Sequence, residues 1–257
     1  MAVAAAAHGW ERHLSFEGGR NGAPANGPTG FGRNGAFTGT HYSSDVAHSG
    51  AQSARFAIER GMKGFGHWGA TLRFPQALHE EDELWVLLHL YLPESFDFGS
   101  PDHDLPLLRL HMASAGGKPQ GFVGLSIVDA GRRLAIVRAA PGKPVERMER
   151  PPMSRGKPLE RGRWHAIELH VRLASKGQAG RVQVWHDASL VAEHRHVALL
   201  PGTFSRMDHL FLFGTWPGGA PRTQSAYVDD LVLTSDRPKQ RDRRGNARLW
   251  PYGSRED

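Results

Sequence analysis

Hydrophobic and polar residues alternate with a period of two along most of this chain, in short segments separated by turn residues. Such alternation is typical of strands that bury one face and expose the other. Helical periodicity is not sustained in any segment of the sequence. We therefore expect strands over residues 52–59, 67–74, 83–92, 105–112, 121–128, 132–138, 164–173, 181–186, 190–197, 209–213 and 226–234.

The order of these strands predicts an all-β protein. Strands that follow one another without intervening helices favour two antiparallel sheets packed face to face. Residues 187–189 predict a tight hairpin, and residues 18–34 and 141–162 predict long irregular loops. A chain of 257 residues suits one such domain. We expect it to span residues 14–236, after an N-terminal extension or signal remnant at 1–13 and before a basic tail at 237–257.

The composition narrows the class of protein. With 39% hydrophobic residues, 31 Gly and 17 Pro, the chain suits short strands and many turns better than a helical bundle. The absence of cysteine excludes a disulfide framework and a thiolate metal site. No apolar run reaches the ~18 residues of a membrane helix, so we expect no membrane partner. The small residues after Met1 are typical of a signal-peptide cleavage region, which favours a secreted or periplasmic protein.

The formal charge of +6 favours polyanionic partners. Nucleic acid and acidic glycans are both polyanions, so charge alone leaves the two open. Much of the positive charge lies in residues 237–248, and a run of like charge is typical of a solvated extension. The remaining body is nearly balanced in charge, and other features must identify the partner.

Four segments between residues 162 and 238 carry a family resemblance: GRWHAIELHVRL, GRVQVWHDASLVAEH, FLFGTW and AYVDDLVLTSDRP. They resemble the C-terminal half of bacterial jelly-roll polysaccharide lyases, such as the alginate, glucuronan and heparin-lyase-like families. The segment LWVLLHLYLPESFDF at residues 84–98 is similar to a strand of these enzymes that ends in YLP. The resemblance covers roughly residues 50–236. It implies a two-sheet antiparallel β-jelly-roll sandwich of the concanavalin A-like kind, and a polysaccharide lyase, which is a carbon–oxygen lyase.

Three of the expected strands carry basic and aromatic side chains on their polar faces. Side chains two residues apart point to the same face of a strand, so each set below shares one face. The sets are Trp85, His89 and Tyr91; Arg109 and His111; and His67, Thr71 and Arg73. If the three faces lie side by side on the concave sheet, they line one cleft.

That cleft would suit β-elimination of a uronic acid. The reaction needs a cation that neutralises the carboxylate, a base that removes the C5 proton and an acid that protonates the departing O4. Arg73 and Arg109 can grip a carboxylate through two hydrogen bonds. His111 or His89 can act as the base, and Tyr91 can transfer the second proton. The aromatic ring of Trp85 can stack on a sugar, and His67 and Thr71 complete the substrate-binding set.

The resemblance implies site residues as well. Arg73 in TLRF is similar to the arginine strand of the lyases, and His111 in LRLH is similar to their strand motif that ends in histidine. Arg109 stands where the alginate lyases have Gln, which leaves the identity of the uronate open.

We therefore predict a monomeric lyase that cleaves an acidic, uronate-containing polysaccharide by β-elimination, with no nucleic-acid partner and no cofactor required for the chemistry. The alternative is a non-catalytic carbohydrate-binding sandwich, which would use the arginines and aromatics of the same cleft but need no proton-transfer groups. A glycoside hydrolase is less favoured, because it needs two carboxylates in one site and the acidic cluster at residues 80–83 precedes a strand at a turn.

Two further sites remain open in the sequence. Trp216, in the loop at residues 214–219, either stacks on a sugar at the cleft mouth or caps the core. Glu17 with Asp229 or Asp230 resembles the paired terminal strands of many jelly rolls, where carboxylates hold a structural calcium. The alternative for these acids is that they cap strands or meet arginines.

Overall fold

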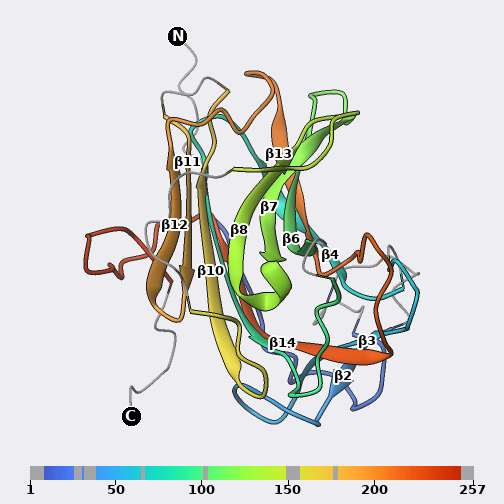
Figure 1. Cartoon of the computed structure of the whole chain (residues 1–257). Helices are drawn as coiled ribbons and strands as arrows, with labels where there is room; N and C mark the ends of the chain where they lie inside the picture. The colour runs from blue at the N-terminus through green and yellow to red at the C-terminus, as the bar shows by residue number, and fades with distance from the viewer. Residues whose placement is uncertain are drawn as a thin grey trace.

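The alternating segments form two antiparallel sheets in the computed structural model, which describes residues 9–25, 31, 39–64, 67–100, 104–148, 157–175 and 179–249 (Figure 1). Sheet A contains, in spatial order, β12 (Ser189–Arg195), β11 (Arg181–His186), β10 (Trp164–Arg172), β5 (Glu83–Tyr91), β14 (Gln224–Thr234), β3 (Ser53–Ile58) and β2 (Thr40–Ser43), and β1 (Glu11–Leu14) also pairs with β14. Sheet B contains β4 (Ala70–Leu78), β13 (Arg206–Leu212), β6 (Leu105–Ala113), β7 (Pro119–Val128), β8 (Arg133–Ala139) and β9 (Glu146–Arg147). The expected all-β sandwich is confirmed.

Each strand expected from the alternation is present, with ends that differ by a few residues. The structure adds β1, β2 and β9, which have four, four and two residues and are too short for alternation to be recognised. The expected hairpin joins β11 to β12 through Asp187 and Ala188, whose φ angles of 45° and 67° are those of a tight hairpin turn. The one helical element among the described residues is the 3-10 turn η1 (Asp129–Gly131).

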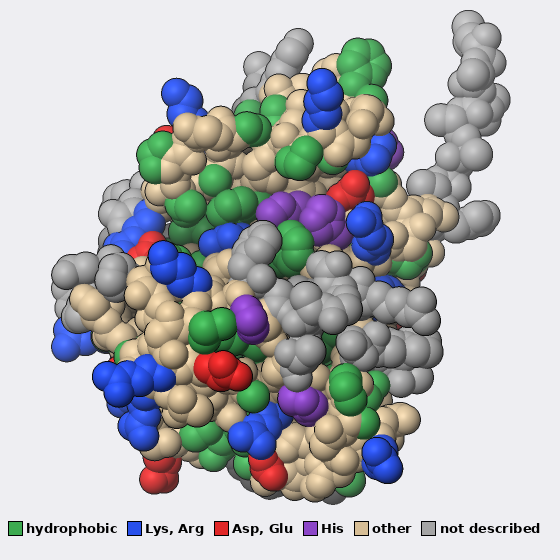
Figure 2. All heavy atoms as spheres, turned by 90° about the vertical axis from the view of Figure 1, so that its right-hand side faces the viewer, with side chains coloured by type: hydrophobic (Ala, Val, Ile, Leu, Met, Phe, Trp, Pro, Cys, Tyr) green, Lys and Arg blue, Asp and Glu red, His purple; other side chains and the backbone are tan. Residues whose placement is uncertain are grey.

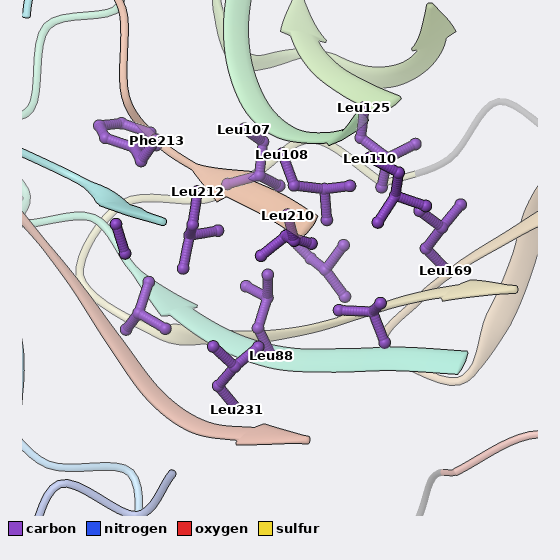
Figure 3. Packing of buried hydrophobic residues seen from close by; sticks show 14 of the residues in the cluster. Leu88, Leu107, Leu108, Leu110, Leu125, Leu169, Leu210, Leu212, Phe213 and Leu231 are labelled. Atoms are coloured by element: carbon purple, nitrogen blue, oxygen red, sulfur yellow. The ribbon is translucent and has the colours of Figure 1, made fainter. Parts of the chain in front are cut away.

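The core lies between the inner faces of the two sheets (Figure 3). Leu88 and Leu231 enter it from sheet A, and Leu110, Leu125 and Leu210 enter it from sheet B. All five side chains have no solvent-exposed surface. Because neighbouring residues on a strand point to opposite faces, packing these leucines inward turns the residues beside them toward the outer faces.

The two chain ends depart from the expected boundaries. Trp10 is buried and β1 is paired with β14, so the sandwich begins inside the expected N-terminal extension; residues 1–8 lie outside the described residues. Part of the expected basic tail packs on the outer face of sheet A. The indole Nε1 of Trp85 donates a hydrogen bond to the Ala247 carbonyl, and the backbone N–H of Leu249 donates one to Glu168. The apolar residues Ala247 and Leu249 explain the packing, because they cover apolar surface that would otherwise face water.

Residues 237–239 and 241–245 remain largely at the surface, and residues 250–257 lie outside the described residues. Within the described ranges, the structure has no helix with the length and apolar character needed to cross a membrane.

Candidate functional site

The outer face of sheet B brings basic side chains from three neighbouring strands together. Arg73 on β4 lies in register with His209 on β13, and His209 lies in register with His111 on β6. Two residues along, the row formed by Thr71, Phe211 and Arg109 is in register in the same way. The row between them consists of Leu72, Leu210 and Leu110, which are buried in the core. Both outer rows therefore point away from the core, on the same face.

We call Thr71, Arg73, Arg109, His111, His209 and Phe211 the sheet B site. Arg73 is exposed, and the other five side chains are partly exposed. Figure 2 looks onto the right-hand side of Figure 1, where sheet B lies. Histidine side chains gather there in a hollow that is bordered by basic, acidic and apolar side chains. A hollow of this composition suits a charged, partly apolar ligand such as a sugar acid.

His111 is held in its neutral form. Burial lowers the pKa of His111 to about 4, and the positive charges of His209 and Arg109 add to this effect. The Nε2 atom of His111 is buried and has no hydrogen-bond partner among the residues that the structure describes. A neutral imidazole can accept a proton, so His111 is chemically able to act as a base at neutral pH.

His209 is oriented by an acid. The distance between His209 Nδ1 and Asp208 Oδ1 is 2.5 Å, and the rings of His209 and His111 are stacked with centroids 4.9 Å apart. A carboxylate that accepts a hydrogen bond from one ring nitrogen fixes the tautomer and the orientation of the ring. His209 is therefore held in a fixed orientation beside the neutral His111.

Arg109 lies at the edge of the histidine pair. Its guanidinium carbon is 4.7 Å from the ring centroid of Phe122, and burial lowers its pKa, which remains far above neutral for an arginine. Its Nε atom is buried without a hydrogen-bond partner among the described residues. A guanidinium is suited to bind a carboxylate, which supplies two acceptor oxygens in matching geometry.

The expectation that Trp85, His89 and Tyr91 share this cleft is wrong. These residues lie on β5, which is paired with β10 and β14 in the centre of sheet A. Alternation placed the three side chains on one face of their strand correctly, but it carries no information about which sheet contains the strand. Trp85 is 1% exposed, and its ring stacks on that of His170 at 4.5 Å. It therefore cannot serve as a sugar platform on sheet B.

His89 and Tyr91 belong to a separate cluster on the outer side of sheet A. The ring of His89 stacks on that of His48 at 3.6 Å, and His48 Nδ1 lies 2.8 Å from Asp230 Oδ2. Burial, followed by the charge of His48, lowers the pKa of His89 to about 3. The ring of Tyr91 contacts Trp164 at 5.4 Å. His89 and Tyr91 therefore do not lie beside Arg109 and His111, as the predicted roles in catalysis require.

The acids predicted to hold calcium contact the loop between β2 and β3. Glu17 accepts hydrogen bonds from the backbone N–H groups of Ala51 and Gln52, and Asp229 accepts them from His48 and Ser49. Burial and the neighbouring Asp230 raise the pKa of Asp229 to about 6. These contacts match the alternative in which the acids cap backbone groups, and calcium at this place stays a prediction.

Two other predicted substrate-binding residues lie apart from the sheet B site. Trp216 is 2% exposed and packs in the core against Phe96, so it caps the core and does not reach a cleft mouth. His67 is exposed in the turn before β4, because Gly69 with a φ of 92° ends the turn and the strand begins at Ala70. Thr71, Arg73, Arg109 and His111 are thus the predicted residues that the fold brings together.

Sequence reasoning missed His209, Asp208 and Phe211. The expected strand begins at residue 209, so Asp208 falls outside it and His209 stands at its very end. The strand begins at Arg206, and its register shifts between Met207 and His209. This irregularity places Asp208 beside His209 and breaks the period-two pattern that would have revealed both residues.

Comparison with known proteins supports the same family that the sequence resembles. A family model described as "Polysaccharide lyase" matches residues 26–232. No curated protein sequence matches the chain at a significant level.

Several solved structures share the fold. The alginate lyase Aly36B superposes with a TM-score of 0.61 at 13% identity, covering 87% of this chain and 96% of that chain. An endo-β-1,4-glucuronan lyase from the fungus Trichoderma reesei superposes with a TM-score of 0.56 at 16% identity, covering 76% and 85%. A PL-14 alginate lyase from Aplysia kurodai gives a TM-score of 0.56 at 15% identity, covering 77% and 87%. At such low identity these similarities concern the fold.

Proposed function

The chain belongs to the polysaccharide lyase family, and from this premise we propose that it cleaves a uronate-containing polysaccharide by β-elimination at the sheet B site. The protein is an enzyme, a carbon–oxygen lyase. Enzymes named for alginate and for glucuronan share its fold, and both names denote acidic polysaccharides. An acidic polysaccharide is accordingly the substrate class that we propose for this chain.

One observation carries the proposal. The register across β4, β13 and β6 aligns Arg73, His209 and His111 on the outer face of sheet B, with Arg109 two residues from His111. Two cations and two imidazoles in adjacent positions provide the charge and the proton-transfer groups that elimination requires.

Each group has a proposed role. Arg109, supported by the exposed Arg73, binds the uronate carboxylate and withdraws charge from it, which makes the C5 proton more acidic. The neutral imidazole of His111 removes that proton. The C4–O4 bond breaks as the C4–C5 double bond forms, and His209, oriented by Asp208, gives its proton to the departing O4. His209 here takes the role that the sequence assigned to Tyr91.

The sheet B site needs no bound cofactor for these steps, because arginine supplies the positive charge and histidine transfers the protons. The substrate is an extracellular polymer, so we further propose that the protein is secreted or periplasmic. We also propose that it acts as a monomer, since the six residues of the site all come from one chain.

The test is incubation of the protein with alginate, glucuronan, pectate and heparin while the ultraviolet absorbance of the unsaturated uronate is recorded. We expect new absorbance with at least one polymer. A carboxyl-reduced sample of the same polymer is the matched control, because it keeps the chain but lacks the group that acidifies C5. It should give no absorbance.

Two outcomes would contradict the proposal. Binding of the polymers without new absorbance would favour the carbohydrate-binding alternative. Equal cleavage of the carboxyl-reduced polymer would show that the reaction does not depend on a uronate.

A further inference from the structure

We propose that His165, His186 and Asp187 bind a transition-metal ion of the zinc class at the end of the β10–β11–β12 part of sheet A. Among the described residues, two groups of His and Asp side chains have ligand atoms within 4.8 Å of one another. One is His48, His89 and Asp230, and the other is His165, His186 and Asp187. The geometry of the two groups differs, and it favours the second.

The fold brings the second group together through adjacent strands. His165 is the second residue of β10, His186 is the last residue of β11, and Asp187 begins the hairpin that leads to β12 (Figure 1). The backbone N–H of Asp187 donates a hydrogen bond to the Ala166 carbonyl, and Asp187 Oδ1 accepts one from the Ala166 N–H at 3.0 Å. These two bonds fix Asp187 against β10, so its Oδ2 atom faces the histidines.

The three ligand atoms form a compact triangle. His186 Nε2 lies 2.8 Å from His165 Nδ1, and Asp187 Oδ2 lies 3.3 Å from His165 Nδ1 and 3.5 Å from His186 Nε2. In a tetrahedral site with zinc–nitrogen bonds of about 2.0–2.1 Å, neighbouring ligand atoms are about 3.3 Å apart. An ion close to the plane of this triangle would reach all three atoms at bonding distance. The two imidazole rings are tilted by 49°, which lets their nitrogens converge.

The surroundings of the triangle hold the ligands in the required state. His165 Nε2 lies 2.8 Å from the Glu160 carbonyl oxygen, which can only accept, so Nε2 carries the hydrogen and Nδ1 presents its lone pair. His186 forms a hydrogen bond with the backbone of Lys157. Metal-binding histidines in proteins are oriented in this way by carbonyl or carboxylate partners. Both rings are buried, with His165 at 0% and His186 at 4% exposure, so water is a weak competitor for the ion.

The charges near the site are balanced. Asp187 Oδ2 accepts a hydrogen bond from Arg163 Nη2 at 2.7 Å, and Arg163 Nε donates to Glu160 at 2.7 Å. Glu160 offsets the charge of Arg163, and a carboxylate has lone pairs for both a guanidinium and a metal ion. Two imidazole nitrogens and one oxygen form a donor set that suits zinc and its neighbours, whereas calcium and magnesium prefer oxygen alone.

The first group lacks this convergence. The rings of His48 and His89 are stacked at 3.6 Å with an angle of 14° between their planes. The lone pairs of parallel rings lie in parallel planes and do not meet at one point. His48 therefore provides a control residue in a cluster of the same composition.

The experiment uses the full-length protein after dialysis against a chelator. We expect isothermal titration with zinc chloride to show one tight site, and zinc but not calcium to raise the melting temperature. Cobalt added instead of zinc should give the visible absorption bands of a tetrahedral site. Replacing a residue that only hydrogen-bonds to a metal ligand weakens metal binding by roughly 10–100-fold. His186→Gln and Asp187→Asn replace ligands themselves, so each should weaken zinc binding by more than this. His48→Gln should leave zinc binding unchanged.

Several results would overturn the proposal. The first is that the chelator-treated protein binds no zinc, in which case a shared proton joins the two rings. The second is that His48→Gln removes the tight site while Asp187→Asn keeps it. If His186→Gln does not fold, the cobalt spectrum of the unsubstituted protein still decides, because the absence of new visible bands on adding cobalt would show that the three side chains bind no such ion. None of these readouts depends on lyase activity.

Discussion

His111 and His209 lie directly opposite each other on β6 and β13, with their rings stacked at a centroid distance of 4.9 Å and an angle of 13°. The two imidazoles differ in environment, because Asp208 accepts a hydrogen bond from His209 while burial keeps His111 neutral. Two like groups in different environments are an arrangement by which one site can contain both a base and an acid.

Replacing His209 should change the protonation of its neighbour. The positive charge of His209 lowers the pKa of His111, so we expect the pKa of His111 to rise from about 4 toward its ordinary value in His209→Ala. Loss of the stacked ring also admits water, which acts in the same direction. An NMR titration of the His111 ring protons measures the change. The exposed His79 provides the control, and an equal rise in His79→Ala would contradict the coupling.

The loss of activity on the acidic side of the pH profile should reflect protonation of His111. As the base, His111 must be neutral, so we expect kcat/KM to fall as the pH drops below about 4, where His111 becomes protonated. Arg109 also lowers the pKa of His111, and Arg109→Gln should therefore move this loss of activity to higher pH as well as reduce the rate. Because kcat/KM reports the free enzyme and the free substrate, the shift separates titration of His111 from titration of the free substrate's carboxylate, which the substitution does not affect. If the acidic side of the pH profile does not shift in Arg109→Gln, His111 is not the base.

Substitutions on the two sheets should have opposite outcomes. We expect His111→Ala to lower kcat by about 10²–10⁴-fold, the usual effect of removing a proton-transfer group. Tyr91→Phe should keep nearly full activity, because Tyr91 lies on sheet A and contacts the rings of Trp164 and Tyr227. The measurement is the initial rate of unsaturated-uronate formation, with circular dichroism to confirm folding. An active His111→Ala and an inactive Tyr91→Phe would move the site to sheet A.

Stability should depend on the leucines that join the sheets. Leu210 is fully buried in the core that Figure 3 shows, so we expect Leu210→Ala to lower the free energy of unfolding by about 2–5 kcal/mol. Denaturant unfolding followed by tryptophan fluorescence measures the change. Val145→Ala is the control, because Val145 is 50% exposed and its truncation removes little buried surface. A small effect at Leu210 would indicate that the inner faces are loosely packed.

The sequence could predict the strands and their faces, but not the sheet to which each strand belongs. Arg109 and His111 were assigned to one face correctly because they are two residues apart. His89 shares the same kind of face, yet its strand lies in sheet A because β5 pairs with β10 and β14. Alternation is a local property, whereas pairing depends on contacts between distant segments, and the pattern of a single sequence does not reveal those contacts.

The proposed metal ligands also come together only through strand pairing, so the sequence did not predict them as a group. His165 has the strand parity of Ile167 and Leu169, which face the core, so the pattern marks it as an interior residue. Its partner His186 is 21 residues further on, and the register of β10 with β11 is needed to see that the two meet.

The packing of residues 247–249 against sheet A has a practical consequence for any protein fused after this domain. Leu249 is bound to Glu168 on the side of the sandwich opposite sheet B. A reporter or affinity tag joined directly after Leu249 would therefore start on the far side from Arg109 and His111, and a long sugar polymer could still lie across the arginines without meeting the added domain.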